Sequence, residues 1–149
     1  MTIDMIALDT DVLAIYHIFH NDQRYNATRG FFDKIGDQIK AITIFNLLEL
    51  CGILTTAIRK EDSMTLFHKY LTAEDTQILF PRFTANEEKD FWATLVSECL
   101  SRIQRGLRLG DSVILWTLET NNIDTIITWN TKHFTGKTSV KVLTPSEFL

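Results

Sequence analysis

The sequence has few of the residues that mark secreted, disulfide-linked or membrane-embedded proteins. Its 149 residues include only two cysteines and two prolines. No run of about 18 uncharged apolar residues is present, so a transmembrane helix is not expected. The start of the chain has no basic segment and carries an early acid, Asp4, which argues against a signal peptide. We therefore expect a cytoplasmic protein whose Cys51 and Cys99 are buried thiols.

The sequence also lacks the excess of basic residues that proteins binding nucleic acid usually show. Lys and Arg total 15 against 19 Asp and Glu, which gives a net charge of -4. This balance weakens a nucleic-acid hypothesis. It does not exclude one, because acidic residues that bind divalent cations lose their negative charge locally. The length and the 45% apolar content fit a single globular domain over residues 1–149.

Short apolar segments alternate along the chain with longer segments of helical periodicity. Strands are predicted over 3–8, 39–44, 76–80, 125–128 and 140–143. Helices are predicted over 12–19, 24–35, 45–58, 60–70, 111–119 and from a capping box at Thr84 and Glu87 to about 105. A terminal turn is expected over 145–148. Strands that alternate with helices indicate an α/β domain with a mainly parallel sheet covered on both faces.

Four acidic or amide residues lie where apolar strands end or helices begin. Asp9 follows Ile6-Ala7-Leu8, and Asn130 follows Ile126-Ile127-Thr128-Trp129. Asp111 stands at the start of a predicted helix, and Glu49 lies one turn into another, among leucines that suggest a place in or beside the core. Ligand sites in open parallel sheets lie outside the carboxyl ends of the strands. All four side chains can therefore face one edge of the sheet.

Three carboxylates and an amide oxygen are hard ligands of the kind that Mg²⁺ or Mn²⁺ takes. Carboxylates brought together in this way cannot all stay ionised without a cation. Simpler interpretations remain open for single members: Asp111 as a helix cap, Asp9 to Asp11 as a turn, and Asn130 as a turn residue. The joint pattern is more specific than any one residue and predicts a metal site suited to phosphoryl-transfer chemistry.

With these residues in place, the chain resembles the PIN-domain ribonucleases, most closely the VapC-like toxins of toxin–antitoxin pairs. The matching segments span nearly the whole chain: Leu8-Asp9-Thr10-Asp11-Val12-Leu13, Leu48-Glu49-Leu50, Gly110-Asp111-Ser112-Val113-Ile114, 127–134 and Val142-Leu143-Thr144-Pro145. The resemblance implies a three-layer PIN-like domain and metal-dependent cleavage of RNA phosphodiester bonds. It also implies a cognate antitoxin and a homodimer.

In that family the equivalents of Asp9, Glu49 and Asp111 bind catalytic Mg²⁺ or Mn²⁺. Two positions depart from the family pattern. The fourth position of the family's site is usually Asp, and here it is Asn130, which cannot supply a charge. The number of metal ions bound, one or two, is therefore left open. The family more often has Asn where Asp11 stands, so Asp11 is a secondary candidate that could restore a negative charge.

Other polar residues are weaker candidates. Thr10 and Thr128 flank two predicted ligands and could orient a carboxylate or a water. Arg102, Arg105 and Arg108 recur every three residues before Asp111. If they share a helix face, Arg105 and Arg108 could bind RNA phosphate, although a solvated helix end explains them equally well. The three tryptophans are expected in the core or in an interface.

Two other functions compete with a ribonuclease. A haloacid-dehalogenase-like phosphatase would use Asp9 as the nucleophile and Asp11 as the general acid. Its late motif should follow an apolar strand, whereas Gly110-Asp111 follows Arg105-Gly106-Leu107-Arg108-Leu109, and Glu49 would have no role. The other possibility is a degenerate PIN-fold module that only binds RNA or protein, with Asn130 as the mark of lost activity.

Overall fold

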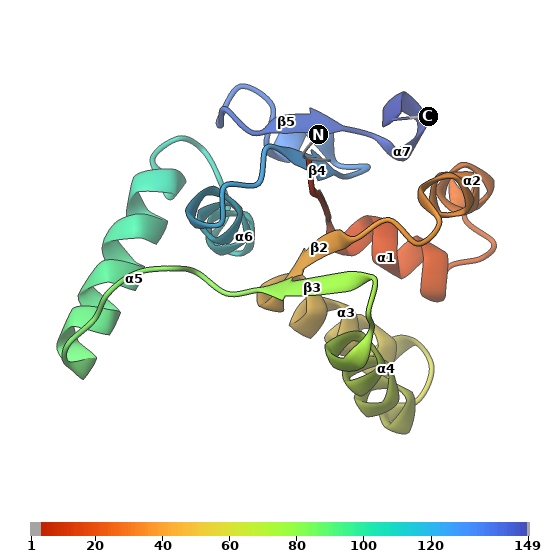
Figure 1. Ribbon diagram of the computed structural model, residues 1–149, viewed down its shortest axis with the longest axis horizontal. Helices are drawn as coiled ribbons and strands as arrows, with labels where there is room; N and C mark the ends of the chain where they lie inside the picture. The colour runs from red at the N-terminus through yellow and green to blue at the C-terminus, as the bar shows by residue number, and fades with distance from the viewer. Residues whose placement is uncertain (1–3, 149) are drawn as a thin grey trace.

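A five-stranded sheet with helices on both faces forms the body of the protein (Figure 1). The computed structural model describes residues 4–148. Its strands are β1 (Ile6–Leu8), β2 (Lys40–Thr43), β3 (Thr76–Leu79), β4 (Thr125–Ile127) and β5 (Lys141–Leu143). They lie in the order β3-β2-β1-β4-β5, and every neighbouring pair is parallel. The predicted α/β class and the mainly parallel sheet are confirmed.

The helices are α1 (Thr10–His17), α2 (Tyr25–Ile35), α3 (Ile44–Ala57), α4 (Lys60–Thr72), α5 (Glu88–Ile103), α6 (Leu109–Thr120) and α7 (Pro145–Phe148), with a 3-10 turn η1 (Thr131–His133). The predicted capping box is wrong: α5 begins four residues later than Thr84, and its N-cap, Glu87, makes no side-chain capping hydrogen bond. The expected terminal turn is the short helix α7. Among residues 4–148, no helix has the length and apolarity needed to span a membrane.

Alternate side chains of the central strand belong to two cores, one on each face of the sheet. Ile6 and Leu8 pack with α1, α2 and α3, and the intervening Ala7 packs with α6. This alternation follows from the two-residue period of a strand. A parallel strand covered on both faces is apolar throughout, which explains the uninterrupted Ile-Ala-Leu sequence before Asp9.

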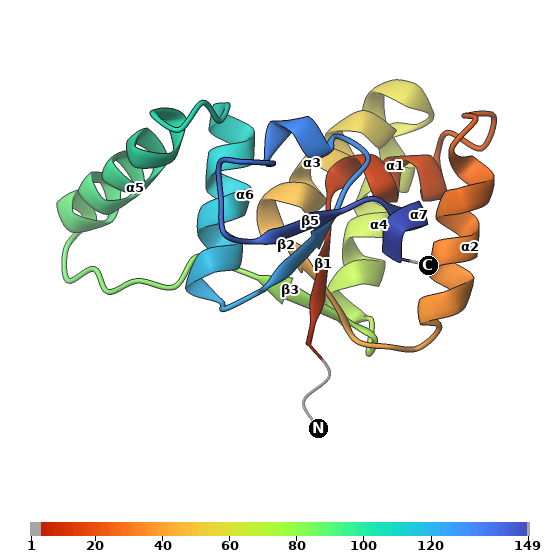
Figure 2. The same cartoon turned by 90° about the horizontal axis from the view of Figure 1, so that it is seen from above.

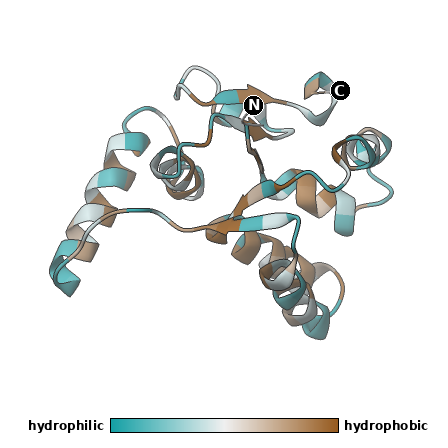
Figure 3. Ribbon diagram, viewed as in Figure 1, coloured by the Kyte–Doolittle hydropathy of each residue, from teal (hydrophilic) through white to brown (hydrophobic). Residues whose placement is uncertain are grey.

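Helix α5 stands away from the rest of the protein, as Figures 1 and 2 show. Its main packing partner is α6. Helix α5 also exposes four apolar side chains at helical spacing: Trp92, Val96, Leu100 and Ile103. Figure 3 shows hydrophobic residues on this helix as well as in the strands. Trp92 is therefore absent from the core, whereas Trp116 is fully buried. Both cysteines are free thiols, but only Cys99 is buried as predicted, and Cys51 is half-buried.

Candidate metal centre at the carboxyl edge of the sheet

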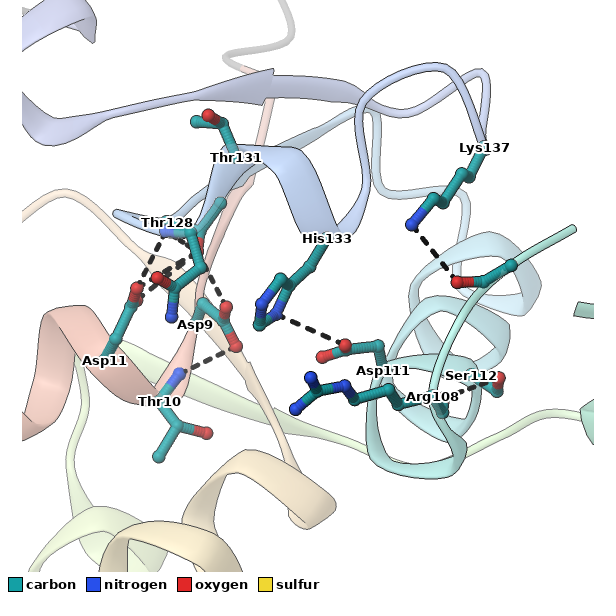
Figure 4. Close-up of polar contacts among 12 residues, drawn as sticks. Asp9, Thr10, Asp11, Arg108, Asp111, Ser112, Thr128, Thr131, His133 and Lys137 are labelled. Atoms are coloured by element: carbon teal, nitrogen blue, oxygen red, sulfur yellow. Dashed lines mark hydrogen bonds and ion pairs between the residues drawn. The ribbon is translucent and has the colours of Figure 1, made fainter. Parts of the chain in front are cut away.

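The acidic residues singled out in the sequence converge at the carboxyl edge of the sheet. Asp9 follows β1 and is the N-cap of α1, while Asp111 lies in the first turn of α6. Glu49 lies in the second turn of α3, which follows β2. The charges of Asp9 and Asp111 both act on Glu49, so the three carboxylates share one electrostatic environment. Figure 4 shows Asp9 and Asp111 turned toward the same region.

Asp9 is buried and is held by three hydrogen bonds. Its Oδ1 accepts from the Thr10 backbone N–H at 2.9 Å and from Asn46 Nδ2 at 3.0 Å. Its Oδ2 accepts from the Thr128 hydroxyl at 2.7 Å. Burial raises the pKa of Asp9, and the hydrogen bonds, led by that from Thr128, oppose this rise. The carboxylate is thus fixed in orientation and costly to ionise, a state that a nearby cation would relieve.

Glu49 lies beside the core and not in it, the second of the two places that the sequence left open. Its neighbours Leu47 and Leu50 are buried, but Glu49 faces solvent at the edge of the site. Its Oε1 accepts a hydrogen bond from the Thr10 hydroxyl at 3.4 Å. Crowding by protein atoms, followed by the charges of Asp9 and Asp111, raises its pKa. Glu49 is therefore an accessible carboxylate that is hydrogen-bonded, through Thr10, to the buried group around Asp9.

Asp111 is half-buried and lies near basic side chains. His133 Nδ1 lies 3.4 Å from its Oδ2, and Arg108 is the N-cap residue of α6, three residues earlier (Figure 4). Burial raises the pKa of Asp111, and the charges of His133, Arg108 and Lys137 act in the opposite direction. Arg108, rather than Asp111, is the N-cap, and the Asp111 side chain makes no capping hydrogen bond. The interpretation of Asp111 as only a helix cap is therefore wrong.

Asp11 holds the segment that follows β4. Its Oδ2 accepts from the backbone N–H groups of Trp129 at 2.9 Å and Asn130 at 3.0 Å, and the Thr128 hydroxyl lies 3.3 Å away. Burial and the charge of Asp9 raise its pKa to about 7. Asp11 therefore fixes the backbone at Asn130. Asn130 is itself exposed, and its backbone N–H makes this contact.

Thr10 and Thr128 both contact the acids, as their positions in the sequence suggested. The Thr128 hydroxyl donates to Asp9 and lies between Asp9 and Asp11. The Thr10 hydroxyl lies between Asn46 and Glu49, accepting from the first and donating to the second. Each threonine thus orients carboxylates that come from different segments of the chain.

Asn46 is a residue of the site that the sequence motifs did not single out. It is 1% exposed and lies in the first turn of α3, three residues before Glu49. Residues three apart in a helix share a face. A polar residue at that spacing from Glu49, flanked by Phe45 and Leu47, was the signal that could have identified it.

The three arginines before Asp111 do not share one surface, so the condition set for joint phosphate binding is not met. Arg102 is buried and pairs with Glu98 and Glu119. Arg105 lies 3.7 Å from Glu119 and lines a separate cavity with Asn122, Asp124 and Ser139. The helix α5 ends at Ile103, so the i, i+3 relation does not extend beyond it. Only Arg108 lies beside the acids.

The donor set suits a hard divalent cation, although the side chains are not closely gathered. In the part of the chain that the structure describes, no three His, Cys, Asp or Glu side chains lie close enough together to form a ready metal site. Burial nevertheless raises the pKa values of Asp9, Glu49 and Asp111, and the charges of neighbouring carboxylates add to the rise for Asp9 and Glu49. A bound cation would remove both penalties.

The fold of this chain is similar to the folds of known toxins. No model of a known protein family matches the sequence, and no curated protein matches it. Among solved structures, the chain is similar to a toxin–antitoxin complex from Klebsiella pneumoniae, with a TM-score of 0.61 and 18% identity over 95% of this chain and 98% of that one. It is also similar to the sarcin-ricin loop cleaving toxin VapC20 from Mycobacterium tuberculosis, with a TM-score of 0.57 and 14% identity over 81% and 86%. The chain has the PIN-like fold of VapC toxins.

A third similar structure is VapBC-1 from nontypeable Haemophilus influenzae, with a TM-score of 0.60 and 18% identity over 95% of this chain and 98% of the other. The VapC-type fold agrees with the resemblance inferred from the sequence motifs. The phosphatase alternative requires Asp111 to follow a strand directly. Asp111 instead lies in the first turn of α6, which comes between β3 and β4 in the chain.

Proposed function

We propose that this chain is a Mg²⁺- or Mn²⁺-dependent endoribonuclease and the toxin of a toxin–antitoxin pair. The observation that supports this most is the convergence of Asp9, Glu49 and Asp111 at the carboxyl edge of a VapC-type fold. These three residues would hold the cation, and Asn130 could add a neutral oxygen. When bound, the cation supplies the charge that polarises the attacking water and the scissile phosphate.

The protein's own residues set the conditions for that chemistry. Thr128 and the Thr10 backbone N–H hold Asp9 in one orientation, and Asp11 holds the segment that ends in Asn130. Arg108 and His133 lie beside Asp111, where basic side chains can bind the phosphates that flank the cleaved bond. This local positive charge at the acidic site offers a way for a chain of net charge -4 to bind RNA.

The substitution Asp9→Asn tests the enzymatic proposal. It keeps the shape of the side chain but removes the buried charge, so Mn²⁺-dependent cleavage of a labelled RNA should fall at least 100-fold, or about 2.7 kcal/mol in transition-state stabilisation. A matched Asp33→Asn variant on the exposed side of α2 should cleave like the wild type. Cleavage that survives Asp9→Asn would contradict the assignment, and RNA binding without any cleavage by the wild type would favour the degenerate module.

The partners are proposed from the same fold. The similar structures from Klebsiella and Haemophilus are complexes of a toxin with an antitoxin, so we propose a cognate antitoxin for this chain. We also propose a homodimer formed through the exposed stripe of Trp92, Val96, Leu100 and Ile103 on α5. An antiparallel pair of α5 helices would place the acidic Glu87 and Glu88 of one copy near the basic Arg105 of the other. Light scattering of the purified chain measures whether the solution mass is that of one copy or two.

A further inference from the structure

Asn46 is a deeply buried polar residue, 1% exposed, in contact with Asp9. Its backbone N–H donates to the Thr43 hydroxyl at 3.1 Å, which caps α3, and that hydroxyl donates to Asn46 Oδ1 at 2.7 Å. Because Oδ1 already accepts from Thr43, the Nδ2 group must point the other way. The amide orientation is therefore fixed from within its own helix turn.

The Nδ2 group of Asn46 reaches two partners on the segment after β1. It donates to Asp9 Oδ1 at 3.0 Å and to the Thr10 hydroxyl at 2.9 Å. The Thr10 hydroxyl in turn donates to Glu49 Oε1 at 3.4 Å. A single buried amide thus connects the carboxylate after β1 with the carboxylate on α3.

These contacts decide which oxygen of Asp9 remains available. A carboxylate oxygen has two lone pairs, and on Oδ1 both are taken, by the Thr10 N–H and by Asn46 Nδ2. Oδ2 accepts only from Thr128, so one lone pair is left. We propose that Asn46 is a positioning residue that makes Asp9 a one-oxygen metal ligand through Oδ2 and, through Thr10, sets the carboxylate of Glu49. This inference rests on the proposed metal-dependent function.

The role is separable from helix capping. The cap of α3 uses the Asn46 backbone N–H and the Thr43 side chain, neither of which changes in Asn46→Ala. The variant loses only the donor to Asp9 and Thr10 and the acceptor for Thr43. A matched control is Leu54→Ala, which removes a buried side chain two turns later in the same helix and touches none of the acids.

The test is a calorimetric titration of each folded variant with Mn²⁺ alone, together with its thermal unfolding midpoint. Asn46→Ala should weaken Mn²⁺ binding by 10- to 100-fold, the range seen when a residue that orients a metal ligand is lost. Asn46→Thr, which can donate one hydrogen bond instead of two, should give an intermediate affinity. Leu54→Ala should lower the unfolding midpoint while keeping the wild-type affinity.

Two results would overturn the inference: wild-type Mn²⁺ affinity in Asn46→Ala, or an equal loss in Leu54→Ala, which would mean general loosening of α3. If Asn46→Ala does not fold, the affinity of Asn46→Thr decides by the same criterion. The proposed function fails separately. It fails if the wild type binds no Mn²⁺ or if Asp9→Asn binds Mn²⁺ as tightly as the wild type. If Asp9→Asn loses Mn²⁺ affinity and Asn46→Ala does not, only the positioning role of Asn46 is overturned.

Discussion

The individual charges around Asp111 differ in what they can contribute to RNA binding. Arg108 is exposed beside the acidic site, whereas Arg105 pairs with Glu119 and lines another cavity. Both stand in the same basic segment of the sequence, between the end of α5 at Ile103 and the start of α6 at Leu109. Charge alone therefore does not identify a residue that contacts the substrate.

Replacing Arg108 by Gln should weaken RNA binding and reduce the slope of log affinity against log salt by about one, because one phosphate contact is lost. Arg105→Gln is the matched control and should leave both unchanged. Fluorescence anisotropy with labelled RNA in the cleavage-deficient Asp9→Asn background measures this. Equal losses in the two arginine variants would mean that the effect comes from overall charge and not from a contact at the site.

Pairs of elements are held together by polar contacts as well as by the core. At the end of α1 away from the acids, the His17 ring is hydrogen-bonded to the Tyr70 hydroxyl of α4. Titratable groups near the ring include Lys69, His20, Tyr16 and Tyr70. Burial, followed by the positive charges of Lys69 and His20, lowers the pKa of His17 from 6.5 to about 4. His17 is thus a neutral connector between two helices and not part of a metal site.

This shift predicts a dependence of stability on pH. Between the unfolded pKa of 6.5 and the folded pKa of about 4, the unfolded chain binds the extra proton, so the free energy of unfolding falls as pH falls. His17 should contribute a loss of roughly 2 kcal/mol between pH 7 and pH 5. Urea unfolding at both pH values should show a shallower decline for His17→Gln than for the wild type. The exposed His68→Gln is the control, and an identical decline in His17→Gln would contradict the assignment.

The sequence predicted the architecture better than the details of the site. Alternation of strands and helices and the acids at strand ends were enough to predict a parallel sheet with the carboxylates at one edge. The sequence left open whether Glu49 lies in or beside the core, because leucines on both sides of a helical position do not show which way the helix faces. Asn46 was missed because its importance comes from contacts with Asp9 and Thr10, which are distant in sequence.

The molecule as a whole works as proposed only if segments from three parts of the chain hold one cation together. Direct titration with Mn²⁺ of the wild type and of Asp9→Asn, Glu49→Gln and Asp111→Asn tests this most directly, without requiring knowledge of the RNA. We predict one Mn²⁺ site whose affinity falls at least tenfold in each variant while the unfolding midpoint stays close to that of the wild type. Wild-type affinity in Glu49→Gln or in Asp111→Asn would contradict it.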